Sequence, residues 1–246
     1  MDFCSINPKG TWEWMYEMPR VMLLTHLVEK YPEYVRLANN HPRTYKILDN
    51  SLIELGGALS MERLIQAADA IGADEIILPD VFKDGKATIE STKEAIDWLK
   101  ERNLLGRYKL MAVAHGNNKD EWKECFDILD EIPEIDVIGI PKVTSTWLEE
   151  RNRKNLFDVF KNSNKEIHFL GSWFNLDELC KLDKEVKVRV RSVDTCLPSL
   201  YAIQGKDFHE DREGTIDLEH EYKELTKEKY DNVINGFLKE FLEENV

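Results

Sequence analysis

Short apolar runs rich in β-branched residues recur along the chain, and a longer stretch with helical spacing follows most of them. These runs predict eight strands, over Val21–Thr25, Tyr45–Leu48, Glu75–Leu78, Lys109–Ala114, Val137–Ile140, Ile167–Leu170, Val186–Arg191 and Leu200–Ile203. Between them, apolar positions in Met61–Ile71 and Ile89–Arg102 return every three or four residues, which is typical of a helix with one buried face. Strands that alternate with helices indicate parallel βα units.

The number and order of these units predict an α/β fold in which residues 1–246 form a single (β/α)8 barrel domain of the TIM type. The chain carries neither a GxGxxG nor a GxxxxGK[ST] phosphate loop, which favours a closed barrel over a nucleotide-binding open sheet. A doubly wound sheet is the structural alternative. The highly charged stretch 206–217 predicts a surface loop, and the apolar spacing within 218–246 predicts a C-terminal amphipathic helix that docks on the barrel.

Composition and charge narrow the class of protein. Of the 246 residues, 42% are hydrophobic, so the chain can bury a sizeable core, and no apolar run reaches the roughly 18 residues of a membrane span. With no signal peptide at the N-terminus, we expect a cytoplasmic protein without a membrane partner. The four cysteines form no CxxC pair, which indicates reduced thiols. A net charge of −14 disfavours a general nucleic-acid binder, although it leaves room for a local basic cleft.

Polar or small residues follow six predicted strands in succession. They are Asp49-Asn50-Ser51, Pro79-Asp80, His115-Gly116-Asn117-Asn118, Ile140-Pro141-Lys142, Gly171-Ser172-Trp173 and Ser192-Val193-Asp194. Each segment alone also fits a turn or a helix cap. The C-terminal ends of barrel strands converge on one mouth, so the ordered set predicts a common polar rim.

Three aspartates belong to this rim. Carboxylates that share a cleft repel one another, which separates their pKa values and lets one stay ionised while another holds a proton. An ionised aspartate can attack the anomeric carbon of a sugar, and a second carboxylate can handle the proton of the departing or arriving group. Arg189 and Arg191 alternate in the predicted strand Val186–Arg191, and we expect them to share a face and to pair with carboxylates inside the barrel.

The ordered segments resemble those of a known family. VRSVDTCLP, which contains Asp194, resembles the nucleophile segment of tRNA-guanine transglycosylases, (β/α)8 enzymes that exchange guanine for a 7-deazaguanine through a covalent Asp–ribose intermediate. The remaining segments fall in the order of the family and are LDNSLIE from Leu48, ILPDVF from Ile77, AHGNNKDEW from Ala114, IGIPKV from Ile138 and FLGS from Phe169.

This resemblance implies a role for each rim segment. Asp194 matches the nucleophile, and Asp49 matches the general acid/base. The residues implied in binding the base are Asp80, His115, Gly116, Gly139, Ile140, Gly171 and Trp173. Either Trp173 or Phe82 could supply a flat wall for the base, and His26 is a weaker candidate for the same rim.

The sequence also departs from the family. In place of the family's DSGGFQ it has Asn50, Ser51, Leu52 and Ile53 after Asp49, and the zinc motif of three cysteines and a histidine is absent, so we expect no metal and no other cofactor. Compact transglycosylase-like proteins of this kind resemble those of viral and bacterial 7-deazaguanine DNA modification systems, which implies the host cytoplasm if the source is a phage.

Several functional alternatives stay open. The expected partner is a purine or 7-deazapurine base with its nucleoside or nucleic acid, and the polymer could be DNA or tRNA. The rivals are hydrolysis in place of exchange, and a catalytically inactive barrel that binds a nucleobase, a nucleotide or a protein partner. The sequence excludes neither a monomer nor a homodimer.

Overall fold

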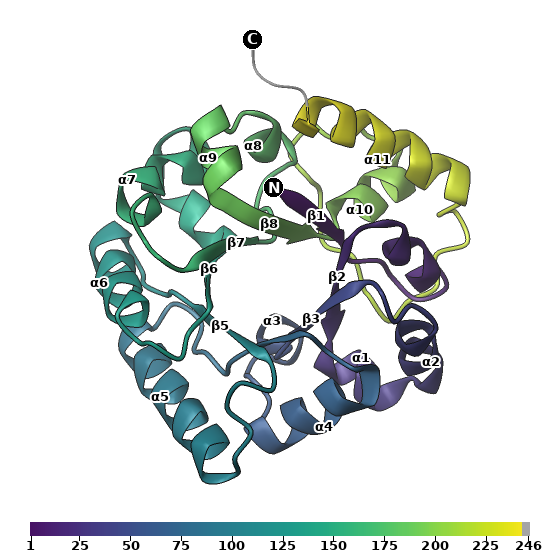
Figure 1. The fold of residues 1–246 in the computed structure, drawn as a ribbon. Helices are drawn as coiled ribbons and strands as arrows, with labels where there is room; N and C mark the ends of the chain where they lie inside the picture. The colour runs from purple at the N-terminus through teal and green to yellow at the C-terminus, as the bar shows by residue number, and fades with distance from the viewer. Residues whose placement is uncertain (243–246) are drawn as a thin grey trace.

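Eight parallel strands surround the centre of the molecule, and helices cover their outer side (Figure 1). The computed structural model describes residues 1–242. The strands are β1 (Asp2–Ser5), β2 (Arg20–Leu24), β3 (Tyr45–Asp49), β4 (Glu75–Ile77), β5 (Lys109–Val113), β6 (Val137–Pro141), β7 (Glu166–Leu170) and β8 (Val190–Thr195). The expected α/β class and the single (β/α)8 barrel are confirmed.

The helices are α1 (Thr25–Lys30), α2 (Pro32–Asn40), α3 (Leu52–Leu55), α4 (Met61–Ile71), α5 (Gly85–Glu101), α6 (Lys119–Asp130), α7 (Phe157–Phe160), α8 (Asp177–Cys180), α9 (Lys184–Arg189), α10 (Leu197–Gln204) and α11 (Lys227–Leu242). Short 3-10 segments lie at Trp12–Glu17, Lys142–Thr146, Glu149–Arg151 and Arg153–Leu156. Helix α4 has the bounds that the sequence predicts. Helix α5 begins before Ile89, because the Asp84 carboxylate accepts a hydrogen bond from the Ala87 N–H at 3.0 Å and caps it there.

The hydrogen-bonded strand order is β1-β8-β7-β6-β5-β4-β3-β2, so the barrel is nearly closed and its seam lies between β1 and β2. These two strands lie next to each other in Figure 1. Strand β1 begins at Asp2 and pairs in parallel with β8, with Cys4 opposite Asp194. Strand β1 is not among the predicted strands, because DFCS is too short to show an alternating pattern.

Two predicted strands are wrong. The first four residues of Val186–Arg191 belong to α9, and the strand follows at Val190–Thr195. Valine alternates with basic residues in this segment, but the valines do not form one buried face, because Val188 is 79% exposed. Leu200–Ile203 lies in α10, which is buried on nearly all sides, so it shows a continuous apolar run in place of helical periodicity.

The apolar core lies between the strands and the surrounding helices. Helix α11 closes the barrel wall beside α8 and α10, and it buries Tyr230, Ile234, Phe237 and Phe241. The predicted helix over 218–246 begins only at Lys227, and residues 243–246 lie outside the described residues. No helix within residues 1–242 combines the length and the apolar character needed to cross a bilayer. All four cysteines are free thiols.

Arg191 forms ion pairs inside the barrel, below the C-terminal ends of the strands. Arg191 lies 2.7 Å from the Glu75 carboxylate and 2.7 Å from that of Glu166, and Glu75 is fully buried. The expected pairing of Arg191 is therefore confirmed. The prediction that Arg189 and Arg191 share a face is wrong, because Arg189 ends α9 and donates to the backbone carbonyls of Ser163 and Lys165.

Candidate active site

A cavity of about 480 Å3 lies at the C-terminal ends of the strands. Its volume falls within the roughly 300–1,000 Å3 that is common for small-molecule sites. Eight of the residues to which the sequence assigns a candidate role line it, and they are His26, Asp49, Asp80, Phe82, His115, Gly171, Trp173 and Asp194. The convergence of the strand ends, which the sequence predicts, brings these residues together from six different strands.

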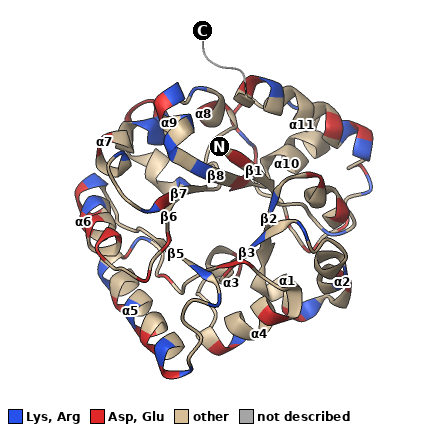
Figure 2. Ribbon diagram, viewed as in Figure 1, with Lys and Arg blue, Asp and Glu red and all other residues tan. Residues whose placement is uncertain are grey.

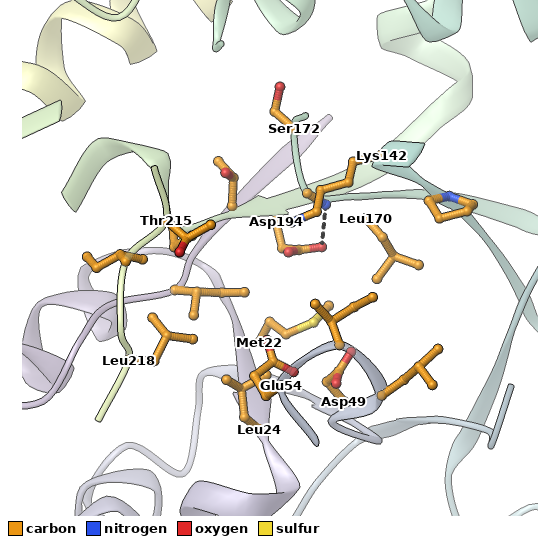
Figure 3. A pocket seen from close by; sticks show the side chains of 18 of the residues that line it. Met22, Leu24, Asp49, Glu54, Lys142, Leu170, Ser172, Asp194, Thr215 and Leu218 are labelled. Carbon is orange, nitrogen blue, oxygen red and sulfur yellow. Dashed lines mark hydrogen bonds between the residues drawn. The ribbon is translucent and has the colours of Figure 1, made fainter. Parts of the chain in front are cut away.

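Asp194 occupies the centre of the view in Figure 3. Its Oδ1 accepts a hydrogen bond from His168 Nε2 at 2.9 Å and another from the Gly171 N–H at 3.2 Å. The residue is only 5% exposed. Among the described residues its Oδ2 has no hydrogen-bond partner, so one carboxylate oxygen is held in place and the other is available to the cavity.

The protonation of His168 follows from its neighbours. Arg191 Nε donates to Ser192 Oγ at 3.0 Å, so the Ser192 hydroxyl can donate its own hydrogen to His168 Nδ1 at 2.8 Å. The ring then carries its proton on Nε2 and donates it to Asp194. Burial lowers the pKa of His168 and outweighs the opposing effect of Asp194, which favours the neutral ring. A chain of hydrogen bonds therefore runs from the barrel interior to the Asp194 carboxylate.

Arg153 fixes the backbone that faces Asp194. This guanidinium is fully buried, and it donates to the carbonyl oxygens of Ile140 at 3.1 Å, Leu170 at 3.2 Å and Gly171 at 2.6 Å. Its charge is paired with Glu178, whose Oε1 lies 2.7 Å from Arg153 Nε. The ends of β6 and β7 are thereby tied together, and the Gly171 peptide is oriented with its N–H toward Asp194.

Asp49 ends β3 on another side of the cavity, where a tight turn supports it. Ser51 has a left-handed backbone with φ of 61°, and its N–H donates to Asp49 Oδ1 at 2.5 Å. The Thr25 hydroxyl donates to the Asp49 carbonyl at 2.6 Å, and Ser51 Oγ accepts from the His26 N–H at 3.2 Å. These side-chain bonds build the turn without the glycines of the resembled family.

The charges around Asp49 favour its protonated form. Burial raises the pKa of Asp49 well above its usual range, and the negative charges of Glu54, Asp80 and Asp194 raise it further. The pKa of Glu54 is also raised, by burial first, while Lys142 opposes that shift. Figure 3 shows Asp49 and Glu54 on one side of Asp194 and Lys142 on the other. The cavity therefore holds carboxyl groups that can act as proton donors beside one with a free anionic oxygen.

Asp80 and His115 form a buried pair. Asp80 Oδ2 lies 2.6 Å from His115 Nε2, and Asp80 Oδ1 accepts from Asn50 Nδ2 at 2.7 Å. His115 Nδ1 accepts from the Lys83 N–H at 3.3 Å, which places the ring proton on Nε2 and makes His115 the donor to Asp80. The pair is therefore a fixed polar wall, with its orientation set by Asn50 and Lys83.

Three residues predicted to bind the base are not among the described residues that line the cavity, and they are Gly116, Gly139 and Ile140. A Cβ at Gly139 would lie 2.7 Å from Leu170 Cδ1, and one at Gly116 would lie 2.3 Å from the Trp122 nitrogen. Close packing inside the barrel and against the start of α6 accounts for these two glycines.

Several residues that shape the site have no role in the prediction from the sequence. Glu54, Lys142 and Arg212 line the cavity, and His168 and Arg153 support it from behind. Glu54 and Lys142 stand inside the quoted segments LDNSLIE and IGIPKV, so their position after a strand could have identified them. His168 lies within the apolar run of β7, and Arg153 lies in an irregular stretch, so neither carries a local signal.

No group of three or more His, Cys, Asp or Glu side chains within residues 1–242 is arranged to hold a metal ion. No protein-family model matches the chain, and no curated protein matches it. The resemblance to transglycosylases stays a prediction, and the function has to be argued from the cavity itself.

Proposed function

We propose that the protein is a base-exchange enzyme of the transglycosylase type, which replaces guanine by a 7-deazaguanine or a related base on a ribose or deoxyribose. The observation that carries this proposal is the Asp194 carboxylate. One of its oxygens is fixed by His168 and by the Gly171 N–H, and the other has no partner among the described residues and borders a cavity with other carboxyl groups.

The proposed first step is a displacement at the sugar. Asp194 Oδ2 attacks C1′, the C1′–N9 bond breaks, and its electron pair goes to N9 of the departing base. Asp49, whose pKa is raised by burial, gives its proton to that base. The products are a glycosyl ester on Asp194, the free neutral base and an ionised Asp49.

The second step reverses the first with another base. The N9 nitrogen of the incoming base attacks C1′, the ester bond to Asp194 breaks, and Asp49 takes the proton from N9. Asp194 is released as a carboxylate and Asp49 is protonated again, so the cycle closes without a cofactor. Water in place of the second base would give hydrolysis.

The polar and aromatic side chains around the cavity are consistent with recognition of a purine. Asp80 and His115 present a polar edge fixed by Asn50, and Phe82 and Trp173 are aromatic residues that border the same cavity. A planar base needs such a combination of edge contacts and flat apolar surface. Phe82 is 39% exposed, so its ring is available to a ligand as well as to its neighbour His115.

The test is an exchange assay with labelled guanine and four acceptors, namely guanosine 5′-monophosphate, guanosine, a guanine-containing DNA oligonucleotide and tRNA. We expect the wild-type protein to incorporate label into one acceptor, and Asp194→Asn to incorporate none while it unfolds at a similar temperature. Asn keeps the shape of the side chain and removes the anionic nucleophile. Release of free base without incorporation would assign hydrolysis, and the absence of both reactions with all four acceptors would overturn the proposal.

A further inference from the structure

A segment far along the chain forms one wall of the cavity. Residues 212–219, the wall segment, follow α10 and contribute Arg212 and Thr215 through Glu219 to the lining. At one end, the Arg212 N–H donates to the Phe174 carbonyl at 2.8 Å. At the other end, the Lys9 N–H donates to the Leu218 carbonyl at 3.0 Å, and the Tyr31 hydroxyl donates to Glu219 Oε2 at 2.7 Å.

The wall segment therefore crosses from the loop after β7 to the neighbourhood of β1 and α1. Thr215 and Leu218 lie beside Asp194 and Met22 in Figure 3. A ligand at Asp194 would be enclosed by the barrel mouth and by this wall, within a cavity of about 480 Å3. These dimensions suit a monomeric small molecule more than a strand that enters and leaves the site.

Two cations stand against the same loop, Gly171–Trp173. The Lys142 stem lies against Gly171, where an added Cβ would approach Lys142 Cδ to 2.7 Å. Arg212 Nε donates to the Trp173 carbonyl at 2.6 Å, and its Nη1 donates to the Gly214 carbonyl. Both residues line the cavity. The loops after β7 and β8 are a common place for phosphate in barrels of this class.

Neither cation has a carboxylate partner at ion-pair distance within the described residues, in a protein with a net charge of −14. Other cations nearby are paired with carboxylates, since Arg151 lies 2.9 Å from Asp211 and Lys206 lies 2.6 Å from Glu213. Figure 2 likewise shows acidic and basic residues mixed over the outer helices. Lys142 and Arg212 are therefore available to bind an anionic group of a ligand, and Lys142 lies on the side of Asp194 away from Asp49 and Glu54 (Figure 3).

We propose that the ligand of this cavity is a free phosphorylated nucleoside, whose phosphate binds between Lys142 and Arg212 beside the loop after β7. The inference rests on the proposed function for the base and the sugar, and it assigns a mononucleotide in place of a nucleic acid as the substrate class. The overall negative charge agrees with it, because it disfavours the approach of a phosphate polymer more than that of a single phosphate.

The test is isothermal titration calorimetry of the full chain with guanosine 5′-monophosphate, guanosine and a single-stranded guanine-containing oligonucleotide. Because the phosphate adds charge-assisted hydrogen bonds to Lys142 and Arg212, we expect the monophosphate to bind at least about tenfold more tightly than guanosine. The oligonucleotide should bind more weakly than the monophosphate. Lys142→Met and Arg212→Met should each remove most of the preference for the phosphate over guanosine.

Lys206→Met is the matched control, because Lys206 is a cation of the same region that is paired with Glu213 and does not line the cavity. It should retain the preference for the phosphate. Equal affinities for monophosphate and nucleoside, tighter binding of the oligonucleotide, or no binding of any of the three would overturn the inference. The wild-type comparison needs no variant, so a variant that fails to fold does not obstruct it.

The two proposals can fail separately. If the monophosphate binds through Lys142 and Arg212 but no base exchange occurs, the ligand class stands and the transferase activity falls. If exchange occurs in an oligonucleotide or in tRNA with no preference for the monophosphate, the activity stands and the ligand class falls.

Discussion

Replacement of Arg153 by methionine tests whether the buried ion pair holds the site together. Arg153 and Glu178 are the two halves of this pair, and the arginine side chain is fully buried. Methionine keeps much of the apolar stem and removes the guanidinium. It leaves the Glu178 carboxylate with three neutral donors, the backbone N–H of residue 153 at 3.2 Å and the hydroxyls of Ser145 at 2.9 Å and Ser172 at 3.2 Å.

The size of the effect follows from the uncompensated charge. Removal of one partner of a buried pair costs about 3–5 kcal/mol, because a charge stays in a medium of low dielectric constant. At about 2–4 °C per kcal/mol for a chain of this size, the unfolding midpoint should fall by roughly 6–20 °C. The double variant Arg153→Met/Glu178→Met removes both charges and should regain part of the loss, because the carbonyls of Ile140, Leu170 and Gly171 still lack their donor.

The assay is urea denaturation of the wild type, the two single variants and the double variant, followed by circular dichroism. Arg63→Met is a suitable control, because Arg63 forms an ion pair with Glu29 at 2.5 Å on the surface, where such pairs contribute about 0–1 kcal/mol. A loss below about 1 kcal/mol for Arg153→Met, or a double variant as unstable as the sum of the two single variants, would refute the argument from an uncompensated charge.

Three other substitutions test parts of the site. Gly171→Ala should lower the free energy of unfolding by about 1–2 kcal/mol in urea denaturation, because Gly171 has φ of 64° and the new Cβ would displace Lys142. An unchanged free energy of unfolding would contradict this backbone strain. His168→Leu should cost about 1–3 kcal/mol, because Asp194 loses its donor, and His168→Gln should recover part of it; equal stabilities of the two variants would contradict the hydrogen-bond chain. Asp49→Asn should stabilise the protein at neutral pH and not at acid pH. The pKa of Asp49 is higher in the folded protein than in the unfolded chain. Asp49 therefore stabilises the fold below the unfolded pKa of about 3.9, and this stabilisation is lost as the pH rises through the folded pKa. Thermal unfolding of both proteins across pH 4–8 measures this, and a constant difference would contradict it.

The sequence predicts the positions at the strand ends better than the strands themselves. Asp49, Asp80, Gly171 and Asp194 all border the cavity, because a polar residue after an apolar run marks the end of a strand and parallel strands end on one side. The error at Val186–Arg191 does not move Asp194, since the strand that replaces it ends at Thr195. The rim could therefore be predicted although one of the eight predicted strands is misplaced, another lies in α10, and β1 is missing from the prediction.

The supporting contacts could not be predicted in this way. Arg153 contacts Gly171 and Glu178 through tertiary packing alone, and its neighbours in sequence form irregular turns. His168 stands where an apolar residue is expected in a strand, and its role depends on Ser192 in the adjacent strand. Most of the wall segment belongs to the stretch 206–217, which the sequence identifies only as a charged loop, and its last two residues belong to the predicted helix. Its place beside Asp194 follows from the bonds of Arg212 to the loop after β7.

The central claim is that Asp194 is a nucleophile, and intact-protein mass spectrometry tests it most directly. Wild type and Asp194→Ala are incubated with guanosine 5′-monophosphate, guanosine, a DNA oligonucleotide and tRNA, and quenched in acid. The account predicts that the wild type alone gains the mass of the donor without its base, which is a phosphoribosyl group for the monophosphate, and that the added group maps to the peptide containing Asp194. No adduct with any donor, together with a nucleotide-induced thermal shift that survives Asp194→Ala, would contradict the account and leave a barrel that only binds its ligand.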